Sequence, residues 1–439
     1  MENSKLGLKK WIAIIVAGLV GQLAWAIENN YLNLYVFDCT GNYNFIRIMT
    51  AASAVAATIT TLFVGALSDR LGRRKLFVSC GYILWGISII AFAFLDPKSS
   101  LTIVANNGFV AGVMIVIMDC IMTFFGSSAN DAAFNASIND HTNPSNRGKV
   151  ESVLSILPLI ALIAVTVVGG IFGVGGEDKE AIHWDFFFYL FGGLTLVIGV
   201  ICLFIYPKDV CKRDKETKYF QNIIYGFRPK VIKDNVSLYL ALTAFMVFNI
   251  AIQIFMPYFM VYIQEVLYIK NDSFTITLGI VLVVASIITV GIGAFMDKIG
   301  RNKIIFPSLG AGVVGAIIMF FVRDQIGVII GGIILMAGYL ISTAVLFSKV
   351  RDYIPQGKEG VFQGVRMVFV VMIPMIVGPY IGSGVSYING EMWQDPTYLQ
   401  WSIKPNEYIF LFAAITMLLV LIPLIFLVRR EKQNEQASE

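Results

Sequence analysis

Long apolar runs separated by short polar segments dominate the chain. Each run is close to the 20 or so residues that an α-helix needs to cross the hydrocarbon core of a bilayer. The runs begin near Trp11, Asn44, Leu76, Val113, Val150, Trp184, Ser237, Phe274, Ile304, Gly327, Val361 and Glu407. Residues 101–112 are also apolar, and they either extend the third run or form an outer hairpin. The pattern predicts an all-α integral membrane protein with twelve transmembrane helices.

A polar gap divides these runs into two sets of six. It predicts four parts: a six-helix bundle over 1–207, a cytoplasmic linker over 208–235, a second bundle over 236–430 and a tail over 431–439. Boundaries drawn from such a pattern carry an error of a few residues.

Composition excludes a soluble enzyme. Hydrophobic residues make up 57% of the 439 positions and charged residues only 14%, against about 25% charged in soluble domains. The net charge of +4 fits the excess of Lys and Arg on the cytoplasmic side of membrane proteins and carries no information about nucleic acid. We expect no nucleic-acid partner. With both termini cytoplasmic, 26 Lys and Arg fall inside and six outside, and Arg366 lies within a span. This asymmetry predicts the orientation of a multi-pass plasma-membrane protein.

Cysteine and histidine are too scattered for a metal or disulfide framework. The five Cys form no C-x-x-C pair and have no His at ligand spacing. Both His, His141 and His183, fall outside the apolar runs, so proton chemistry inside the membrane would use carboxylates. There is no Walker loop and no catalytic set. We therefore expect neither a cofactor nor a bound metal, and no enzymatic activity.

A charged loop motif occurs twice. Residues 65–75 read GALSDRLGRRK and residues 293–303 read GAFMDKIGRNK, so both fit G-x-x-x-D-[RK]-x-G-R-x-K. The loop 65–75 comes directly after the second span, and the loop 293–303 comes directly after the eighth span. The chain is therefore two pseudo-symmetric six-helix halves of one design, and such repeats mark secondary transporters.

This doubled loop resembles the signature of the major facilitator superfamily. The resemblance covers the whole chain, and it implies two helical bundles in a V, a substrate cavity at the midplane between them and alternating access by rocking. It also implies a cytoplasmic gate. Its residues here are Gly65, Asp69, Arg70, Gly72, Arg73, Asp297 and Arg301.

The physical chemistry of the loop fits such a gate. Asp69 ends a span close to a cluster of Arg and within reach of a helix N-terminus, where a carboxylate is favoured. Gly65 and Gly72 allow close helix approach and a tight turn. The alternative is that the basic residues of 70–75 only fix topology.

Spans one and four carry a finer likeness, to sugar–cation symporters of the glycoside–pentoside–hexuronide family and to sucrose and maltose carriers. The segments are Trp25-Ala-Ile-Glu28-Asn29-Asn30-Tyr31 and Ala129-Asn130-Asp131-Ala-Ala-Phe134-Asn135. Those families place carboxylates in these two spans, where they bind sugar hydroxyls and a coupling ion. Span two of melibiose-type carriers also holds paired Asp for sodium. Residues 45–68 have none, which favours protons over sodium.

An ionisable group within the membrane costs about 3 kcal/mol or more, so it marks a functional site by default. Glu28 lies just past the middle of span one, and Trp25, Glu28, Tyr31 and Tyr35 fall at helical spacing. Aromatic rings stack on sugar rings, and carboxylates accept hydroxyl hydrogen bonds. The alternative is a structural Glu bonded to a neighbouring helix.

The repeat places the other buried polar groups. It puts Asn130 and Asp131 inside the bundle, whereas Asp119 falls in the outer third of span four, where water is one possible partner. Gln253 occupies the place of Glu28 in span seven, with Asn249 one turn earlier. This suggests that the second half binds substrate, or that both residues join helices.

These residues give the predicted sites. Arg366 either snorkels to the cytoplasm or pairs with a carboxylate across the cavity. Proton coupling is assigned to Glu28, Asp131 and Asp119. Substrate binding is assigned to Trp25, Asn29, Tyr31, Asn130, Asn249, Gln253 and Arg366.

We therefore expect a monomeric, proton-coupled symporter of a small sugar or glycoside that works in a lipid bilayer. A proton-coupled exporter of amphipathic compounds is the first alternative. It is disfavoured because span five, residues 150–175, lacks the G-P-x-x-G-G element of such antiporters, and Gly378-Pro379-Tyr-Ile-Gly382 echoes it only in part. A non-transporting membrane sensor is the second. It is disfavoured because only about ten residues follow Arg429.

Overall fold

The computed structural model divides the chain into two compact units. The N-terminal unit is Met1–Thr217 with Gln394–Ser402, and the C-terminal unit is Lys218–Trp393 with Ile403–Glu439. The structure describes residues 7–97, 99, 101–104, 107–142, 150, 153–154, 156–174, 182–210, 226–355, 359–390, 392–394 and 401–438. The four predicted domain boundaries stay predictions, because residues 211–225 of the linker lie outside these ranges.

The N-terminal unit is built from helices, several of which join end to end into one span. The elements are α1 (Leu8–Ala26), the π-helix η1 (Ile27–Tyr31), α2 (Leu32–Thr40), α3 (Asn44–Leu71), α4 (Arg74–Ala91), the 3₁₀-helix η2 (Phe92–Phe94), α5 (Gly108–Gly126), the π-helix η3 (Ser127–Phe134), α6 (Asn135–His141), α8 (Leu157–Ile171) and α9 (Trp184–Ile205). The first span is α1–η1–α2 and the fourth is α5–η3–α6, so each has a π-helix in its middle.

The C-terminal unit has the same character. Its helices are α11 (Pro229–Asp234), α12 (Val236–Val261), the π-helix η4 (Tyr262–Val266), α13 (Asn271–Ile299), α14 (Arg301–Phe321), α15 (Gln325–Asp352), α16 (Glu359–Met367), the π-helix η5 (Val368–Met372), α17 (Ile373–Val385), α18 (Tyr408–Leu419) and α19 (Leu421–Ser438). Besides the helices of the two units, two short strands, β1 (Met392–Gln394) and β2 (Trp401–Ile403), pair in a two-stranded sheet.

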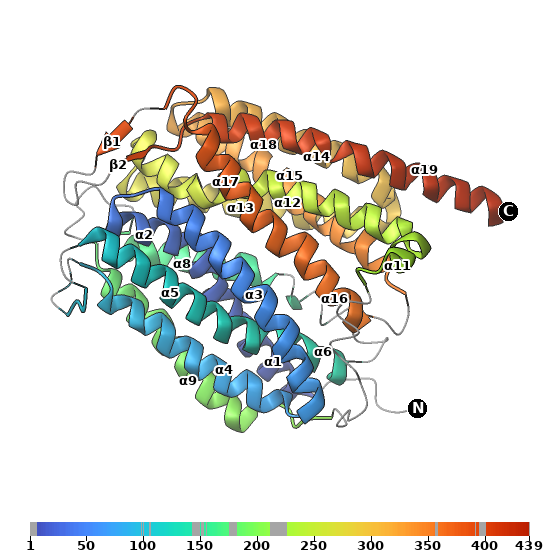
Figure 1. The fold of residues 1–439 in the computed structure, drawn as a ribbon, viewed down its shortest axis with the longest axis horizontal. Coiled ribbons are helices and arrows are strands. Elements are labelled where there is room, and N and C mark those ends of the chain that lie inside the picture. The colour runs from blue at the N-terminus through green and yellow to red at the C-terminus, as the bar shows by residue number, and fades with distance from the viewer. Residues whose placement is uncertain are drawn as a thin grey trace. The chain divides into compact units, whose positions relative to one another are not determined.

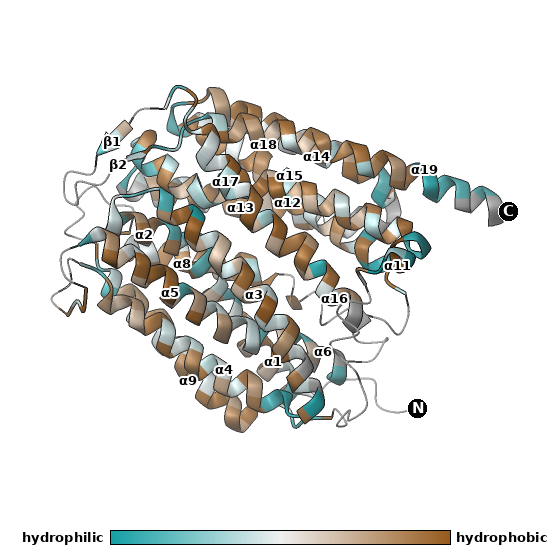
Figure 2. Cartoon of the chain, in the orientation of Figure 1, coloured by the Kyte–Doolittle hydropathy of each residue, from teal (hydrophilic) through white to brown (hydrophobic). Residues whose placement is uncertain are grey.

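The predicted fold class is confirmed. Among the described residues, eleven helices are long and apolar enough to cross a membrane, and the fifth predicted span contains the shorter apolar helix α8. Figure 2 shows hydrophobic residues along the helices and a hydrophilic end on α19. The apolar stretch 101–112 extends no helix of the third span: η2 ends at Phe94, and α5 begins only at Gly108.

Small residues let the helices approach closely within each unit. In the N-terminal unit α4 and α9 run side by side (Figure 1). A Cβ added at Gly86 would lie 2.5 Å from the backbone nitrogen of Leu196 and 2.6 Å from the carbonyl oxygen of Gly192. In the C-terminal unit a Cβ at Gly338 would lie 2.5 Å from the nitrogen of Gly312. Such contacts replace the hydrophobic effect as a packing force between membrane helices.

Candidate functional site

A buried cluster of two carboxyl groups joins the first and fourth spans of the N-terminal unit. Glu28 on η1 is 6% exposed and Asp119 on α5 is 1% exposed. Thr123, one turn after Asp119, donates its hydroxyl proton to Oε1 of Glu28 at 2.8 Å. Glu28 and Asp119 lie close enough to interact electrostatically, and Ser53 of α3 contacts Asp119 from a third helix.

Two oxygens of this cluster are left over. Among the described residues, Oε2 of Glu28 and Oδ1 of Asp119 are buried without a hydrogen-bond partner. No group of three or more His, Cys, Asp or Glu suited to a metal was found in the described part of the chain. The cluster can therefore bind and release a proton or accept hydrogen bonds from a ligand hydroxyl. Asp119 is 1% exposed and faces the interior of the unit, so the alternative that it meets water in the outer third of its span does not hold.

The local sequence explains how Glu28 reaches this position. Two Asn of η1 and one at the start of α2 donate their side-chain amides to the carbonyl four residues earlier: Asn29 to Trp25, Asn30 to Ala26 and Asn33 to Asn29, at 2.9 to 3.0 Å. These bonds give additional partners to backbone carbonyls at the end of α1 and within the π-turn. A π-turn shifts the side chains that follow it out of α-helical register, and such turns are frequent at functional sites.

The predicted aromatic face of the first span is split by this turn. Tyr31 is 1% exposed and packs on Phe187, with ring centroids 5.5 Å apart, inside the unit. Tyr35 is also buried and donates to the carbonyl of Phe92 at 2.6 Å. Trp25 is half-buried, and the centroid of its ring lies 5.1 Å from that of Trp85. Asn29 is exposed, so Trp25 and Asn29 are the members of this predicted set that a ligand can reach.

Asn130 and Asp131 of the fourth span lie one helix segment further on, in η3. The side-chain oxygen of Asn130 accepts a bond from the Tyr82 hydroxyl at 3.2 Å, and a Cβ at Gly21 would lie 2.5 Å from that oxygen. Asn130 is 4% exposed, so the structure places it as a bridge between helices. Asp131 is half-buried and accepts a bond from Ser127 at 3.1 Å.

In the C-terminal unit the predicted substrate residues are half-buried. The Asn249 amide donates to the carbonyl of Val370 in η5 at 3.1 Å, which joins α12 to this π-helix. Gln253 packs against Gly378, where an added Cβ would lie 2.4 Å from the Gln253 Cβ. The Arg366 guanidinium lies over the Phe347 ring at 4.9 Å, a cation–π contact within the unit. All three side chains thus help to join helices.

The repeated loop motif builds a polar network at one end of each unit. Gly72 has a φ of 60°, which fits the tight turn expected there after α3. Gly300, at the matching place after α13, also has a positive φ, of 94°. The side chains of Asp69 and Asp297 lie outside the described part of the structure. Arg70 and Arg73 are exposed, and Gly65 accepts a bond from Ser68 at 2.9 Å.

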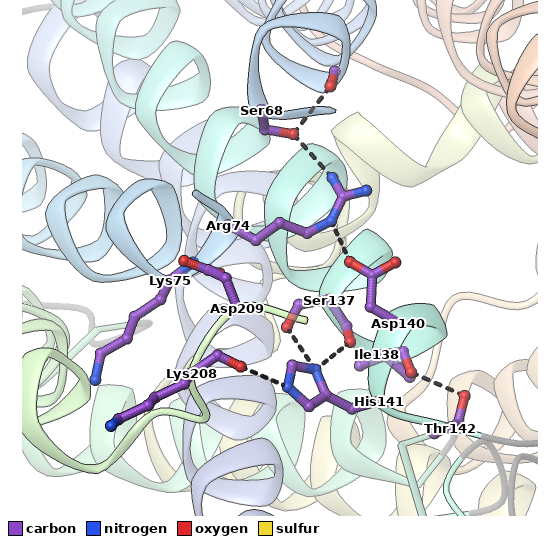
Figure 3. A network of polar contacts seen from close by, with 11 residues as sticks. Ser68, Arg74, Lys75, Ser137, Ile138, Asp140, His141, Thr142, Lys208 and Asp209 are labelled. Carbon is purple, nitrogen blue, oxygen red and sulfur yellow. Dashed lines mark hydrogen bonds and ion pairs between the residues drawn. The ribbon is translucent and has the colours of Figure 1, made fainter. Parts of the chain in front are cut away.

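Arg74 is the centre of the N-terminal network (Figure 3). Its Nε contacts Oδ2 of Asp140 at 2.5 Å, and its Nη1 donates to the Ser68 hydroxyl at 3.0 Å. The side chain is only 9% exposed. Arg74 therefore ties the end of α3 to the end of the fourth span.

The segment after α9 joins the same network. Asp209 accepts a bond from the backbone nitrogen of Lys75 at 2.8 Å, at the start of α4, where a carboxylate is favoured by the helix dipole. The two ring nitrogens of His141 face the carbonyl oxygens of Ser137 and Lys208, at 2.8 and 3.0 Å (Figure 3). The ends of spans two, three, four and six are thus linked within this unit.

The C-terminal unit repeats the arrangement with other residues. Arg301 donates to Asp352 at the end of α15. Glu431 of α19 accepts bonds from Lys349 at 2.7 Å, from Asn302 at 2.8 Å and from the Tyr353 hydroxyl. Glu431 is therefore the point that joins α14, α15 and α19.

Sequence reasoning assigned no role to Asp140, Glu431 or Thr123. Asp140 and Glu431 lie outside both copies of the doubled loop motif, so no motif pointed to either of them. Thr123 had a readable signal, since it lies four residues after Asp119 and so shares its helix face.

Comparison with known proteins agrees with this architecture. The profile of the Major Facilitator Superfamily matches residues 11–379. No curated protein sequence matches the chain. The crystal structure of a D-xylose–proton symporter is similar, with a TM-score of 0.72, 16% identity and coverage of 94% of this chain and 97% of that one.

Two further solved transporters have the same fold. A single-residue mutant of the nucleoside transporter NupG gives a TM-score of 0.69 at 12% identity, covering 96% of this chain and 100% of that one. A bacterial homologue of the human lysosomal transporter Spinster gives 0.70 at 10% identity, covering 97% and 98%. With the membrane-length helices, the doubled loop motif and a profile match over most of its length, the chain belongs to the major facilitator superfamily, and it is a multi-pass membrane transporter.

Proposed function

We propose that this transporter is a symporter that couples the entry of a small sugar or glycoside to a proton, by alternating access. The observation that carries the proposal is the buried pair Glu28 and Asp119. The hydrogen bond from Thr123 to Glu28 joins the helices on which the two carboxyl groups lie. We place the protein in the plasma membrane as a monomer, with both termini cytoplasmic.

The pair has the properties of a proton-binding site. Desolvation penalises the charged form of a carboxyl group, and a second carboxyl nearby penalises it further. Within the described residues no ion pair offsets either charge, and one oxygen of each group has no hydrogen-bond partner. Two negative charges in this interior are therefore unfavourable, and a proton bound to the pair removes one of them. Exposure of the pair to the other side of the membrane reverses the balance and releases the proton.

A sugar is the substrate class that the accessible groups favour. Trp25 offers a half-buried ring and Asn29 an exposed amide on the same turn as Glu28. Ring faces stack on pyranose faces, and amides bond hydroxyls. Two of the solved structures with the same fold are a D-xylose–proton symporter and a nucleoside transporter. Xylose is a sugar and a nucleoside contains one, which supports this substrate class here.

Proton coupling supplies enough energy for a scavenging importer. One charge moving through 100 mV gives about 2.3 kcal/mol. At about 1.4 kcal/mol per decade of concentration, this corresponds to roughly 50-fold accumulation.

A substrate panel in proteoliposomes tests the proposal. Purified protein is reconstituted with a pH dye inside, and D-xylose, lactose, glucuronate and mannitol are added outside one at a time. We expect at least one of them to acidify the lumen without added sodium and to accumulate against its gradient. Outward pumping of a lipophilic dye would support an exporter and contradict the proposal. If none of the four probes is transported, transport of sugars and related polyols is contradicted.

A further inference from the structure

Four polar residues form a row along the fourth span. Asp119, Thr123, Ser127 and Asp131 follow one another at intervals of four residues, which places them on one face of a helix. Asp119, Thr123 and Ser127 are at most 1% exposed, and Asp131 at the end of the row is half-buried. The row thus leads from the buried pair to a carboxylate that solvent can reach.

Each hydroxyl of the row donates to a carboxylate. Thr123 donates to Oε1 of Glu28 at 2.8 Å, and Ser127 donates to Oδ2 of Asp131 at 3.1 Å. The adjacent Ser128 behaves differently, because its hydroxyl donates to the carbonyl of Phe124 in its own helix at 2.6 Å. In this segment, the hydroxyls of Thr123 and Ser127 are thus directed at acidic groups, whereas that of Ser128 is not.

The row changes helix type where the second hydroxyl lies. The π-helix η3 begins at Ser127, so Ser127 and Asp131 lie in the wider turns of this segment. Titratable groups that face Asp131 electrostatically from neighbouring elements are Glu28 of η1 and Tyr82 of α4.

We propose that this hydroxyl row, Thr123 and Ser127, carries the proton between the Glu28–Asp119 pair and Asp131. The inference rests on the proposed proton coupling and extends it by naming the path and its second acceptor. Thr123 and Ser127 are one turn apart, and residues at this spacing have Cβ atoms about 5–6 Å apart. One bridging water spans such a gap by hydrogen bonds.

The proton count balances along the row. The O–H bond of the protonated carboxyl of the pair breaks, and its proton goes to the Thr123 oxygen. Thr123 passes its own proton through the water to the Ser127 oxygen, and the O–H bond of Ser127 breaks as its proton joins Oδ2 of Asp131. The pair has lost one proton, Asp131 has gained one, and both hydroxyls are restored.

The path makes a prediction that a structural role does not. Sugar exchange by the protonated carrier needs no proton release, whereas net uptake does. Ser127→Ala should therefore slow sugar-driven acidification of the lumen at least tenfold, while sugar counterflow stays within twofold of wild type. Ser128→Ala, the matched control on the adjacent residue, should leave both rates within twofold, and Ser127→Thr should restore acidification.

The measurement uses full-length protein in proteoliposomes with an internal pH dye, with the panel sugar that acidifies wild-type vesicles fastest as the probe. Asp131→Asn serves as the second variant and should reproduce the phenotype of Ser127→Ala. Wild-type acidification in Ser127→Ala, equal slowing in Ser128→Ala, or parallel loss of counterflow and acidification would each overturn the path.

The failure of the path is distinguishable from the failure of the proposed function. If Glu28→Gln and Asp119→Asn abolish acidification while Ser127→Ala leaves it unchanged, the pair couples protons and the path is wrong. If Glu28→Gln and Asp119→Asn still acidify the lumen, the proton coupling proposed for the pair is itself wrong.

Discussion

The Arg74–Asp140 pair should contribute more to stability than the Arg301–Asp352 pair of the other half. Arg74 is 9% exposed and Asp140 25%, and Arg74 also bonds Ser68. A hydrogen bond to a charged group is worth about 1.5–3 kcal/mol, and the partial exposure of Asp140 lowers this by solvent screening. We therefore expect a coupling energy of about 2 kcal/mol between Arg74→Gln and Asp140→Asn in a double-mutant cycle.

The matched control is the pair Arg301–Asp352. These side chains are 31% and 51% exposed, and exposed pairs contribute about 0–1 kcal/mol. The cycle of Arg301→Gln and Asp352→Asn should therefore give less than about 1 kcal/mol of coupling.

A thiol-reactive dye follows unfolding in detergent, because Cys39 and Cys202 are buried and react only when the protein opens. For a unit of this size, about 1 kcal/mol shifts Tm by roughly 2–4 °C. The first cycle should show a coupling term of about 4–8 °C and the second roughly 0–4 °C. Equal coupling in both cycles, or none in the first, would refute the argument from burial.

Three further predictions follow from single positions. Asp69→Asn should cut transport severely at normal expression, and Asp297→Asn should cut it less, because the second loop has Lys298 and Asn302 where the first has Arg70 and Arg74; uptake assays that show equal loss would contradict this ranking. Asn130→Ala should lower the free energy of unfolding by about 1–3 kcal/mol, and with it Tm, because a buried hydrogen-bond partner is lost. The pH profile of uptake should stay unchanged, and an altered profile would contradict a purely structural role. Gly86→Ala should destabilise the protein by about 1–3 kcal/mol or more through overpacking against α9, whereas Gly193→Ala, with no atom near the added Cβ, should not; similar Tm values for the two would contradict the close helix contact.

The sequence predicts the membrane fold because its signals are long and repeated. Twenty-residue apolar runs and a doubled loop each report a global constraint, and the family match bears both out. Residue roles within the bundle depend on helix rotation instead. The π-turn at 27–31 rotates Tyr31 into the core, and no pattern of apolar positions in the first span indicates a π-turn.

Long-range partners were likewise beyond sequence reasoning. Glu28 and Thr123 are 95 positions apart, and Asn302 and Glu431 are 129 positions apart. Four-residue spacing within one span is readable, as in the row from Asp119 to Asp131. Contacts between spans require the packing angles and rotations of two helices, which a single sequence does not specify.

The measurement that tests the account most directly compares two fluxes in vesicles containing the Glu28→Gln variant. Sugar counterflow reports substrate exchange, and the internal pH dye reports proton entry with the sugar. We predict that Glu28→Gln exchanges the sugar, fails to concentrate it, and loses both acidification and the pH dependence of its rate. The control Glu265→Gln, which removes a carboxylate paired with Lys270 at 3.5 Å, should behave as wild type. Uphill uptake by Glu28→Gln with wild-type acidification and pH dependence would contradict the account.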